Sequence, residues 1–390
     1  MIGTFWSLVP AILAIVLALI TKEVYSSLFA GILIGAIFYA ASAVGGFTFA
    51  GFSQHLFQDG LIAQLSDPYN VGILVFLVVL GIMVSLMNKA GGSAAFGRWA
   101  KKHIKTKVGA QCATILLGVL IFIDDYFNCL TVGSVMKPVT DKYGVSKEKL
   151  AYLIDATAAP ICIIAPISSW AAAVSGFVTE GENGIALFCK AIPFNFYALF
   201  TLIMMFALVF MKFEYGTMSK YEKALEMMSE AEREKIENEK VKGNTKGKVI
   251  DLVLPVLFLL IFCVLGMIYS GGFFDSESES KFNFIEAFAN SDASVGLVIG
   301  SFATLIVSVI YYCCRRVLKF KDCMESIPEG FKAMVPAILI LAFAWTLKSM
   351  TDSLGAAEYV AGLVSGSAES LQFFLPAIVF IIAVFLAFAT

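Results

Sequence analysis

Long apolar runs separated by short charged segments constrain the fold of this chain more than any other feature. The runs that approach the length needed to cross a hydrocarbon core of about 30 Å lie at about 4–20, 24–44, 71–88, 150–178, 191–211, 250–270, 293–313 and 334–349. Hydrophobic residues make up 59% of the chain and charged residues 15%, whereas about 25% of a soluble domain is charged. The sequence therefore predicts an all-α polytopic membrane protein.

The charge of the chain and its distribution indicate where the protein is located and which partners are expected. The net charge is −2 and there is no basic face, so no nucleic-acid partner is expected. The first run lacks a small-residue cleavage site before Lys22, which favours a retained span over a signal peptide. Lysine and arginine collect in some connecting segments and acids in others, and the positive-inside rule assigns the basic segments to the cytoplasm. The sequence predicts a multi-pass protein of the inner (cytoplasmic) membrane in contact with the lipid bilayer.

Two adjacent carboxylates, Asp124 and Asp125, lie inside an otherwise uncharged stretch at 108–136. A charge near the bilayer centre costs about 2.5–3.5 kcal/mol on insertion scales, so the pair indicates a functional site. The flanking segments 98–107 and 137–149 are both basic and are therefore expected in the cytoplasm. The two limbs would rise about 24 Å and about 17 Å, short of a crossing. A re-entrant helical hairpin with the carboxylates at its tip is predicted; a solvated loop is the alternative.

A second irregular element follows at 150–178. It is too long for one upright span and contains Pro160 and Pro166. Proline removes a backbone donor and frees a carbonyl group in the preceding turn. Because transporters coordinate small cations with broken helices near the midplane, a broken span is predicted, with simple kinks as the alternative.

The candidate cation- and proton-binding residues belong to these two elements. Asn128 and Thr131 follow the acidic pair by one turn and share its side if the limb is helical; ordinary hairpin packing is their alternative role. Asp155 would lie near the cytoplasmic end of its span, where a helix N-terminus also favours an acid. The predicted set is Asp124, Asp125, Asn128, Thr131, Asp155 and Thr157, with Asp124 and Asp125 as sodium ligands.

The order of the spans repeats along the chain. The spans before residue 90 correspond in order to those from residue 250 onward, and the charge assignment makes the two sets run in opposite directions. Residues 1–212 are therefore predicted to form a first transmembrane repeat, and residues 249–390 a second, inverted repeat. Residues 213–248, rich in Glu and Lys, are predicted to be a cytoplasmic linker. The second repeat is expected to be incomplete, since it stops before a second hairpin and broken helix.

One block of the sequence resembles a known family. Residues 122–170, FIDDYFNCLTVGSVMKPVTDKYGVSKEKLAYLIDATAAPICIIAPISSW, look like the signature region of the NhaC family of sodium/proton antiporters, and the likeness extends more loosely over the chain. The resemblance implies inverted repeats with re-entrant hairpins. It points to Asp124, Asp125, Asn128, Asp155 and Thr157 and, as a substrate-binding stretch, to Ser168, Ser169 and Trp170. A small-residue motif usual in the second half of the family is missing, because the chain reaches AVFLAFAT where that motif should begin.

The predicted function is secondary active transport that exchanges sodium for protons. Two close carboxylates repel, so at least one should hold a proton unless a cation neutralises them. The resemblance also covers a malate/lactate exchanger and suggested amino-acid carriers, so sodium- or proton-coupled carriage of an organic acid or amino acid is the alternative. Sodium and protons are expected as partners and no further cofactor is expected; a homodimer stays open.

An enzyme is not expected. Asp124-Asp125-x-x-Asn128 loosely resembles the Asp-rich magnesium motif of membrane prenyltransferases. Those enzymes need a second Asp-rich motif to hold the diphosphate metals, and the remaining apolar runs contain none. An intramembrane aspartyl protease would need a Gly-x-Gly-Asp element, which is also missing.

Overall fold

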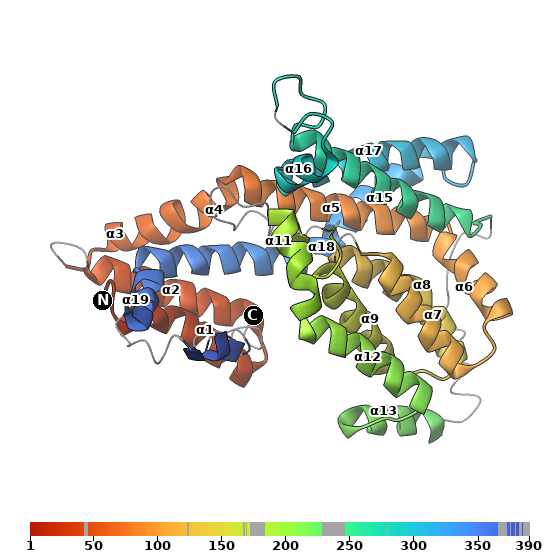
Figure 1. The fold of residues 1–390 in the computed structure, drawn as a ribbon, viewed down its shortest axis with the longest axis horizontal. Coiled ribbons are helices and arrows are strands. Elements are labelled where there is room, and N and C mark those ends of the chain that lie inside the picture. Colours follow the sequence, from red (N-terminus) through yellow and green to blue (C-terminus); the bar gives the residue numbers. More distant parts are fainter. Residues whose placement is uncertain are drawn as a thin grey trace. The chain divides into compact units, whose positions relative to one another are not determined.

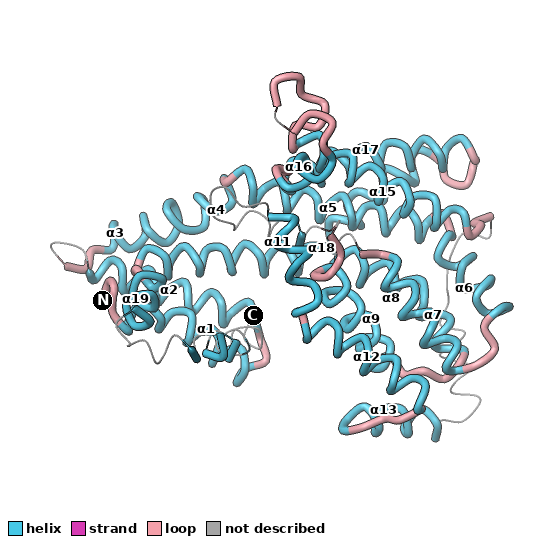
Figure 2. The backbone as a smooth tube through the Cα atoms, in the orientation of Figure 1, coloured by secondary structure: helices cyan, strands magenta, loops and turns pink. Residues whose placement is uncertain are grey.

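The regular elements of the described chain are all helices (Figures 1 and 2). The computed structural model describes residues 1–42, 46–122, 125–166, 168, 170–171, 184–227, 246–278, 280–365, 373–374, 376–378, 380–381 and 384. Within this part, six helices are long and apolar enough to cross a membrane. This confirms the predicted all-α polytopic membrane protein.

The helices fall into two compact units. Unit 1 consists of Met1–Val71 and Met334–Thr390, and unit 2 of Gly72–Ala333. The elements of unit 1 are η1 (Phe5–Leu8), α1 (Val9–Thr21), α2 (Val24–Ser42), α3 (Phe49–Ser53), the π-helix η2 (Gln54–Ile62), α4 (Ala63–Ser66), the later part of α18 (Phe320–Ser353) and α19 (Ala356–Ser365).

In unit 1, α1 and α2 pack closely through small residues. A Cβ atom at Gly31 of α2 would lie 2.7 Å from the carbonyl oxygen of Pro10 in α1. Such close approach strengthens van der Waals packing. In lipid this packing holds helices together, because the hydrophobic effect does not drive their association there. Apolar side chains from α1, α2, η2 and α18 complete this core: Ala14, Leu28, Ile32, Ala36, Leu56, Leu347 and Met350.

Unit 2 contains most of the helices. Its elements are α5 (Pro68–Lys89, from Gly72 on), α6 (Gly92–His103), α7 (Lys107–Leu120), α8 (Asp125–Lys142), α9 (Lys147–Cys162), α11 (Gly184–Ala191), η3 (Ile192–Phe194), α12 (Phe196–Met211), α13 (Gly216–Met227), α15 (Ile250–Ser270), α16 (Phe284–Ala289), α17 (Ala293–Cys314) and the start of α18.

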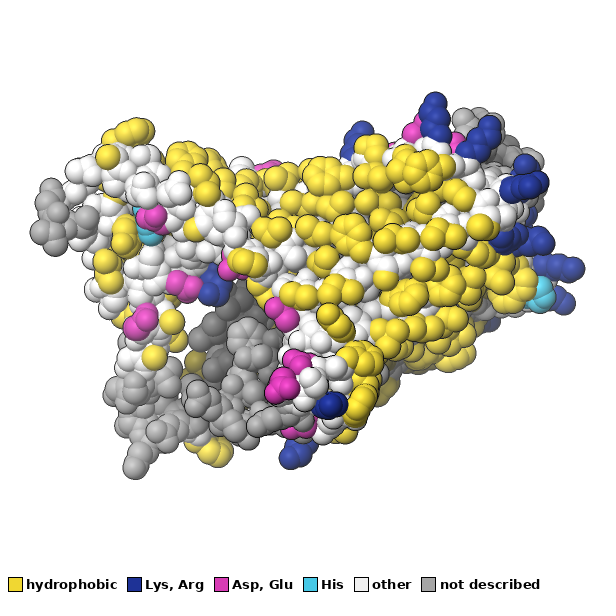
Figure 3. Space-filling view, turned by 90° about the horizontal axis from the view of Figure 1, so that it is seen from above, with side chains coloured by type: hydrophobic (Ala, Val, Ile, Leu, Met, Phe, Trp, Pro, Cys, Tyr) yellow, Lys and Arg dark blue, Asp and Glu magenta, His cyan; other side chains and the backbone are white. Residues whose placement is uncertain are grey.

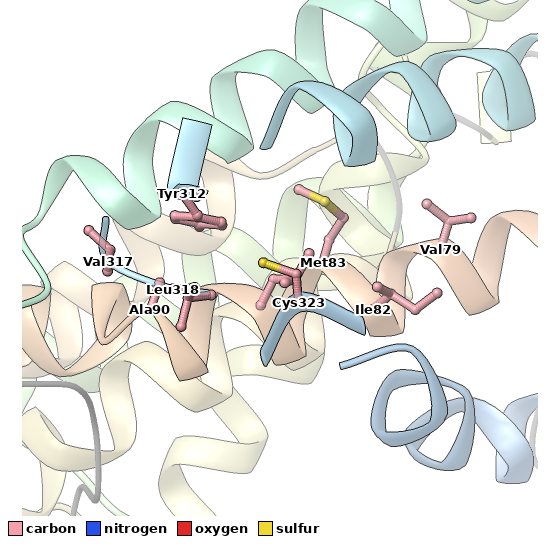
Figure 4. Packing of buried hydrophobic residues seen from close by; sticks show 9 residues of the cluster. Val79, Ile82, Met83, Ala90, Tyr312, Val317, Leu318 and Cys323 are labelled. Carbon is pink, nitrogen blue, oxygen red and sulfur yellow. The ribbon is translucent and has the colours of Figure 1, made fainter. Parts of the chain in front are cut away.

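The core of unit 2 brings α5, α17 and the first turn of α18 together (Figure 4). Met83 and Cys323 lie close to each other in this view, and Val317 and Leu318 lie near Tyr312. The buried members of this cluster are Val79, Ile82, Met83, Leu86, Ala90, Tyr312, Val317, Leu318 and Cys323.

The helices α15 and α17 pack backbone against backbone. A Cβ atom at Gly300 of α17 would lie 2.5 Å from Cα of Cys263 in α15, and Gly266 is as tightly opposed by Gly296. Because small residues let helix backbones approach in this way, the two helices form a dense antiparallel pair. Ser301, Thr304 and Ser308 of α17 are fully buried.

Hydrophobic side chains form a broad face over the helices of unit 2, and Lys and Arg gather at its edges (Figure 3). Apart from the face in this view, α12 also exposes apolar side chains: Phe200, Ile203 and Phe210 are each 63% exposed. In a soluble protein such a face would be an aggregation hazard, whereas in a membrane it contacts the acyl chains.

The helices follow the predicted apolar runs, with three differences. First, α9 continues through Pro160 and ends at Cys162, so the predicted break starts only after this proline. Second, α8 continues through Pro138 to Lys142, beyond the predicted limb. Third, α18 begins at Phe320, well before the run predicted at 334–349. The predicted linker begins with α13, whereas 228–245 lies outside the described residues. The predicted repeats, residues 1–212 and 249–390, and their inverted relation stay predictions.

Candidate functional site

The helices α7 and α8 form an antiparallel pair whose ends are tied together. At one end, the Tyr143 hydroxyl after α8 donates to the Ile104 carbonyl before α7. At the other end, Asn128 Nδ2 donates to the carbonyl oxygens of Gly118 and Ile121, each at 2.7 Å. The last carbonyl groups of a helix have no partner within it, so the amide of Asn128 closes the tip of the pair. Asp124, which lies between α7 and α8 in the sequence, is outside the described residues.

Two buried oxygens beside this tip have no hydrogen-bond partner among the described residues. Asn128 Oδ1 is one, because only the nitrogen side of its amide is used, and Thr131 Oγ1 is the other. Their residues are 0% and 1% exposed. Asp125, Asn128 and Thr131 follow one another at intervals of three, so they share one face of α8. This face presents a carboxylate, an amide oxygen and a hydroxyl oxygen, and we call it the α8 stripe.

The first part of α9 lies against α7 through a glycine. A Cβ atom at Gly118 would fall inside contact distance of Thr157. Thr157 is fully buried, and its hydroxyl lies 2.8 Å from Leu153 O and 3.0 Å from Ile154 O. The hydroxyl proton therefore points along α9, which leaves the lone pairs of Thr157 Oγ1 as acceptors. Gly118 thus brings Thr157 to the helix whose last carbonyls Asn128 binds.

The chain leaves α9 through an irregular segment and turns back towards α8. Ser168 is buried; its hydroxyl lies 2.7 Å from Cys162 O and accepts from Ala171 N at 3.0 Å. Pro166 lies inside this segment and cannot continue the α9 ladder. Trp170, 43% exposed, begins the next helical turn and donates from Nε1 to Asp125 Oδ1 at 3.4 Å. The segment thus carries an indole donor to the start of the α8 stripe.

The structure brings part of the predicted set together. Asp125, Asn128 and Thr131 lie on one face, and Trp170 contacts the first of them. Asp155 instead lies on the exposed side of α9, with Ala151 and Ala159. The hydroxyl of Ser168 is hydrogen-bonded to the backbone of Cys162 and Ala171. Ser169, like Asp124, lies outside the described residues. The roles of all these residues stay predictions.

Sequence reasoning missed two residues of α7. Gly118 is the contact point for α9, and Gln111 is 4% exposed with its Oε1 unpaired among the described residues. A single glutamine in an otherwise apolar run was a visible signal, because a buried amide needs partners. A glycine gave no such signal, since several others occur in the same runs.

The α8 stripe has the chemistry of a site for a small hard cation. Such cations take carboxylate, amide and hydroxyl oxygens as ligands. Asp125 supplies a negative charge, and Asn128 Oδ1 and Thr131 Oγ1 supply neutral oxygens that nothing in the described chain occupies. Of the two, the amide oxygen is held in place, because its nitrogen is fixed to the tip by two hydrogen bonds.

Comparison with known proteins identifies the family. A family model described as the Na+/H+ antiporter family matches residues 171–390. An uncharacterized protein from Haemophilus influenzae is 35% identical over 400 residues, which cover 100% of this chain and 74% of that protein. No solved structure matches the chain. The match confirms the family expected from residues 122–170, through a different part of the chain, and points to a transporter rather than an enzyme. The chain belongs to the Na+/H+ antiporter family.

Proposed function

We propose that this protein exchanges sodium for protons across the inner (cytoplasmic) membrane. The observation that carries the proposal is the α8 stripe, in which Asp125 is followed by the unpaired oxygens of Asn128 and Thr131. Buried polar atoms almost always have partners, so unpaired acceptors beside a carboxylate favour a cation as the missing partner. Membership of the Na+/H+ antiporter family supports the same function.

The proposed ligands favour a monovalent cation. Exchange of one proton for one monovalent cation leaves the net charge of the Asp124–Asp125 pair unchanged, so neither state of the cycle adds an uncompensated charge away from water. In the proposal, Asp124 supplies the neighbouring carboxylate that holds the proton, and Thr157 adds a hydroxyl oxygen from α9. Asp155 takes part on the approach to the site.

Competition couples the two ions in this proposal. Repulsion between Asp124 and Asp125, together with loss of water, keeps a proton on the pair until sodium arrives. Sodium binding expels the proton, and protonation from the other side of the membrane expels sodium. Ser168, Ser169 and Trp170 line the entrance, and the indole of Trp170 releases Asp125 when sodium binds. The transported ions are the only ones that the cycle needs.

The proposed architecture is that of two inverted repeats. Residues 1–212 and 249–390 form the repeats, and residues 213–248 link them in the cytoplasm. The α7–α8 pair serves as the re-entrant hairpin, because its ends are tied together and α7, at 14 residues, rises only about 21 Å. All the proposed ligands come from one chain, so a homodimer would carry one site in each copy.

Sealed vesicles that contain the purified protein and a pH-sensitive dye test the proposal. Sodium should collapse an imposed pH gradient, and Asp125→Asn, which removes the charge at nearly constant volume, should abolish the collapse. Glu148→Gln is the matched control, because it removes a carboxylate from the exposed first turn of α9 and should leave exchange unchanged. Normal sodium-driven exchange by Asp125→Asn would overturn the proposed site.

The same vesicles separate ion exchange from coupled carriage of an organic substrate. Sodium alone should be sufficient to move protons. If proton movement instead requires malate, lactate or an amino acid in addition to sodium, the protein is a coupled carrier and the exchange proposal fails.

A further inference from the structure

The helix α6 changes the direction of the chain at one end of α5. The candidate span α5 ends at Lys89, and Gly91, with φ 78°, redirects the chain into α6. Figure 1 shows α6 running across the direction of α5. Because a helix that crosses the bilayer ends near the lipid headgroups, α6 starts at that level and runs along it.

One face of α6 packs inward through small residues. Ala94, Ala95 and Ala100 are buried. A Cβ atom at Gly92 would lie 2.8 Å from the backbone of Asp251 at the start of α15, and one at Gly97 would lie 3.6 Å from Cβ of Pro138 in α8. These contacts fix α6 against two neighbouring helices of unit 2, so its opposite face is held outward.

Aromatic side chains form a stripe on α6. Phe96, Trp99 and His103 follow one another at intervals of three and four, so they share one side of the helix. The ring centroids of Phe96 and Trp99 are 5.3 Å apart, and those of Trp99 and His103 are 4.7 Å apart. Trp99 is 46% exposed. Tryptophan is enriched at the headgroup level of membranes because its ring is apolar and carries one polar N–H.

Basic side chains lie beside this stripe. Arg98 and Lys102 of α6 and Lys105 after its end are exposed, and the stretch 98–107 contains no acid. Among the described residues, none of these three basic side chains forms an ion pair. Arg98 Nη2 donates to the carbonyl oxygen of Gly247 at 3.3 Å, which is a neutral partner. Their positive charges are therefore not compensated by these neighbours.

The segment before α15 adds a further positive charge. A Cβ atom at Gly247 would lie 2.5 Å from the carbonyl oxygen of Ala90, so this segment packs on the turn between α5 and α6. Lys248 follows Gly247 and has an exposed side chain. We call Arg98, Trp99, Lys102, Lys105 and Lys248 the α6 patch.

The acids of the adjoining segments are already bound. Asp251 is fully buried and pairs with Arg315. Glu222 is 3% exposed and pairs with Lys107. Asp141, near the end of α8, also has a partner. The α6 patch therefore presents several positive charges next to an exposed tryptophan, at the level of the headgroups.

We propose that the α6 patch binds the headgroups of anionic phospholipids, such as phosphatidylglycerol. The basic side chains bind the lipid phosphates, and Trp99 lies between the headgroups. A basic face that adjoins an exposed tryptophan is typical of helices that lie in the membrane interface. The positive-inside rule alone requires only the sign of the charge. A soluble acidic partner would need to displace lipid from Trp99, whereas an anionic lipid contacts the ring and the charges together.

Quenching of tryptophan fluorescence by brominated lipids tests the proposal. The full chain is placed in vesicles of phosphatidylcholine with a minor fraction of phosphatidylglycerol, and either lipid carries bromine on its acyl chains. The chain contains four tryptophans, so the difference between the unchanged protein and Trp99→Phe gives the signal of Trp99. We expect phosphatidylglycerol to be enriched about fivefold beside Trp99, the effect of one Lys or Arg near an anionic surface. Quenching in proportion to the bulk lipid fractions would overturn the proposal.

Charge-neutral variants locate the binding on α6. Arg98→Gln, Lys102→Gln and Lys105→Gln combined should return the quenching of Trp99 to the bulk lipid fraction. The control combines Lys319→Gln, Lys321→Gln and Lys332→Gln, which removes the same charge from other exposed positions and should preserve the enrichment.

Both combinations change exposed side chains, so their melting temperatures should equal that of the unchanged protein. The vesicles have the same lipids in both leaflets, so the orientation of the protein does not affect the result. Enrichment that persists in the α6 variant, or an equal loss in both combinations, would refute the site.

Salt and a soluble headgroup identify the interaction and its source. Enrichment should disappear at about 1 M salt, where the Debye length is about 3 Å and exposed charges are screened. Glycerophosphoglycerol, which has the phosphate but no acyl chains, should not reduce the enrichment at the concentration of the lipid. Enrichment that is insensitive to salt, or its loss to the soluble headgroup, would contradict the proposal. Sodium-driven exchange is not measured in these experiments, so their failure would leave the proposed ion site untouched.

Discussion

Two antiparallel helix pairs of unit 2 differ in how an aspartate at the start of one helix is bound: Asp251 is buried, and Asp125 is half-buried. In the α15–α17 pair, Asp251 is fully buried and each of its oxygens is bound: Oδ1 by Arg315 and the Tyr311 hydroxyl, and Oδ2 by the backbone N–H of Lys248. In the α7–α8 pair, Asp125 accepts from backbone N–H groups at the start of α8, and the side-chain donor that reaches it in the described chain is Trp170, at 3.4 Å. The first carboxylate is part of the frame, whereas the second still has capacity for a ligand.

The neutral polar groups of the two helix pairs also differ in whether they have hydrogen-bond partners. On α17, the hydroxyl of Thr304 donates to the Gly300 carbonyl one turn earlier. On α8, the Thr131 hydroxyl and the Asn128 amide oxygen have no partner among the described residues. Burial alone therefore does not identify a functional residue. The feature that separates the two pairs is whether the hydrogen-bonding capacity of the buried groups is used, since an unused one costs free energy that a ligand can return.

The largest effect is expected at the ion pair of the α15–α17 pair. Arg315→Ala would leave Asp251 buried without its counter-charge, and breaking such a pair costs about 3–5 kcal/mol. Because Arg315 is 27% exposed, we expect the lower end of this range as a loss in the free energy of unfolding in detergent. Lys321→Ala, whose lysine is 85% exposed, should cost less than about 0.5 kcal/mol. If the two variants were equally stable, Asp251 would not be the structural member of the comparison.

The next effect concerns how closely α7 and α9 approach. Gly118→Ala would force α7 away from Thr157, and a displacement of about 1 Å in a site can lower activity about 100-fold. We therefore expect a loss of sodium-driven proton movement on this scale. Gly133→Ala is the control, because its new Cβ would only make ordinary contact with Ile154 at 3.6 Å. A similar loss in both variants would indicate a general sensitivity of the helices and not a site between them.

A crossed pair of threonine variants tests the comparison directly. Thr131→Val removes an unpaired hydroxyl, so the sodium KM should rise about tenfold while the free energy of unfolding stays the same or increases. Thr304→Val removes a paired hydroxyl, so it should cost about 1 kcal/mol of stability and leave the sodium KM unchanged. The reverse outcome, a stability loss for Thr131→Val with normal sodium affinity, would make the α8 stripe a packing feature.

The smallest effect on function is expected from single-cysteine variants, whose labelling tests whether α15 crosses the membrane while the shorter α7–α8 pair does not. Lys105→Cys and Lys142→Cys flank α7 and α8 at exposed positions, and both should react only from the cytoplasm. Glu277→Cys, in the loop that follows α15, should react only from the other side, since 21 residues rise about 32 Å and cross the core. Each variant, in a background without reactive native thiols, should retain exchange. Reaction of Lys142→Cys from outside would turn the α7–α8 pair into a plain crossing.

The helices could be predicted from the sequence, but the contacts that distinguish the two helix pairs could not. Apolar length decides whether a segment spans lipid, so the runs predicted α2, α5 and α17 closely. Asp251 and Asp125 both lie at the start of an apolar helix, and nothing local separates them. The difference comes from Arg315, which lies 64 positions after Asp251 in the chain.

Side-chain direction was the second limit on the predicted site. Asp155 and Thr157 are two positions apart and were predicted together, yet α9 directs the first outward and buries the second. Successive residues of a helix turn by about 100°, so a prediction of polar residues needs to know which side faces the neighbours. Asn128 and Thr131 lie on one face of α8 because a spacing of three places two residues on the same side of any helix.

Asn128 connects the occupancy of the candidate site to the rigidity of the hairpin. Its nitrogen holds the last carbonyls of α7, and its oxygen faces the candidate site. A cation on the oxygen would polarise the whole amide and make its N–H groups stronger donors, as happens along chains of hydrogen bonds. Sodium would then stiffen the joint between the two helices, and its departure would relax that joint. One amide would act as a mechanical sensor, so that the hairpin is firm with its ion and compliant without it.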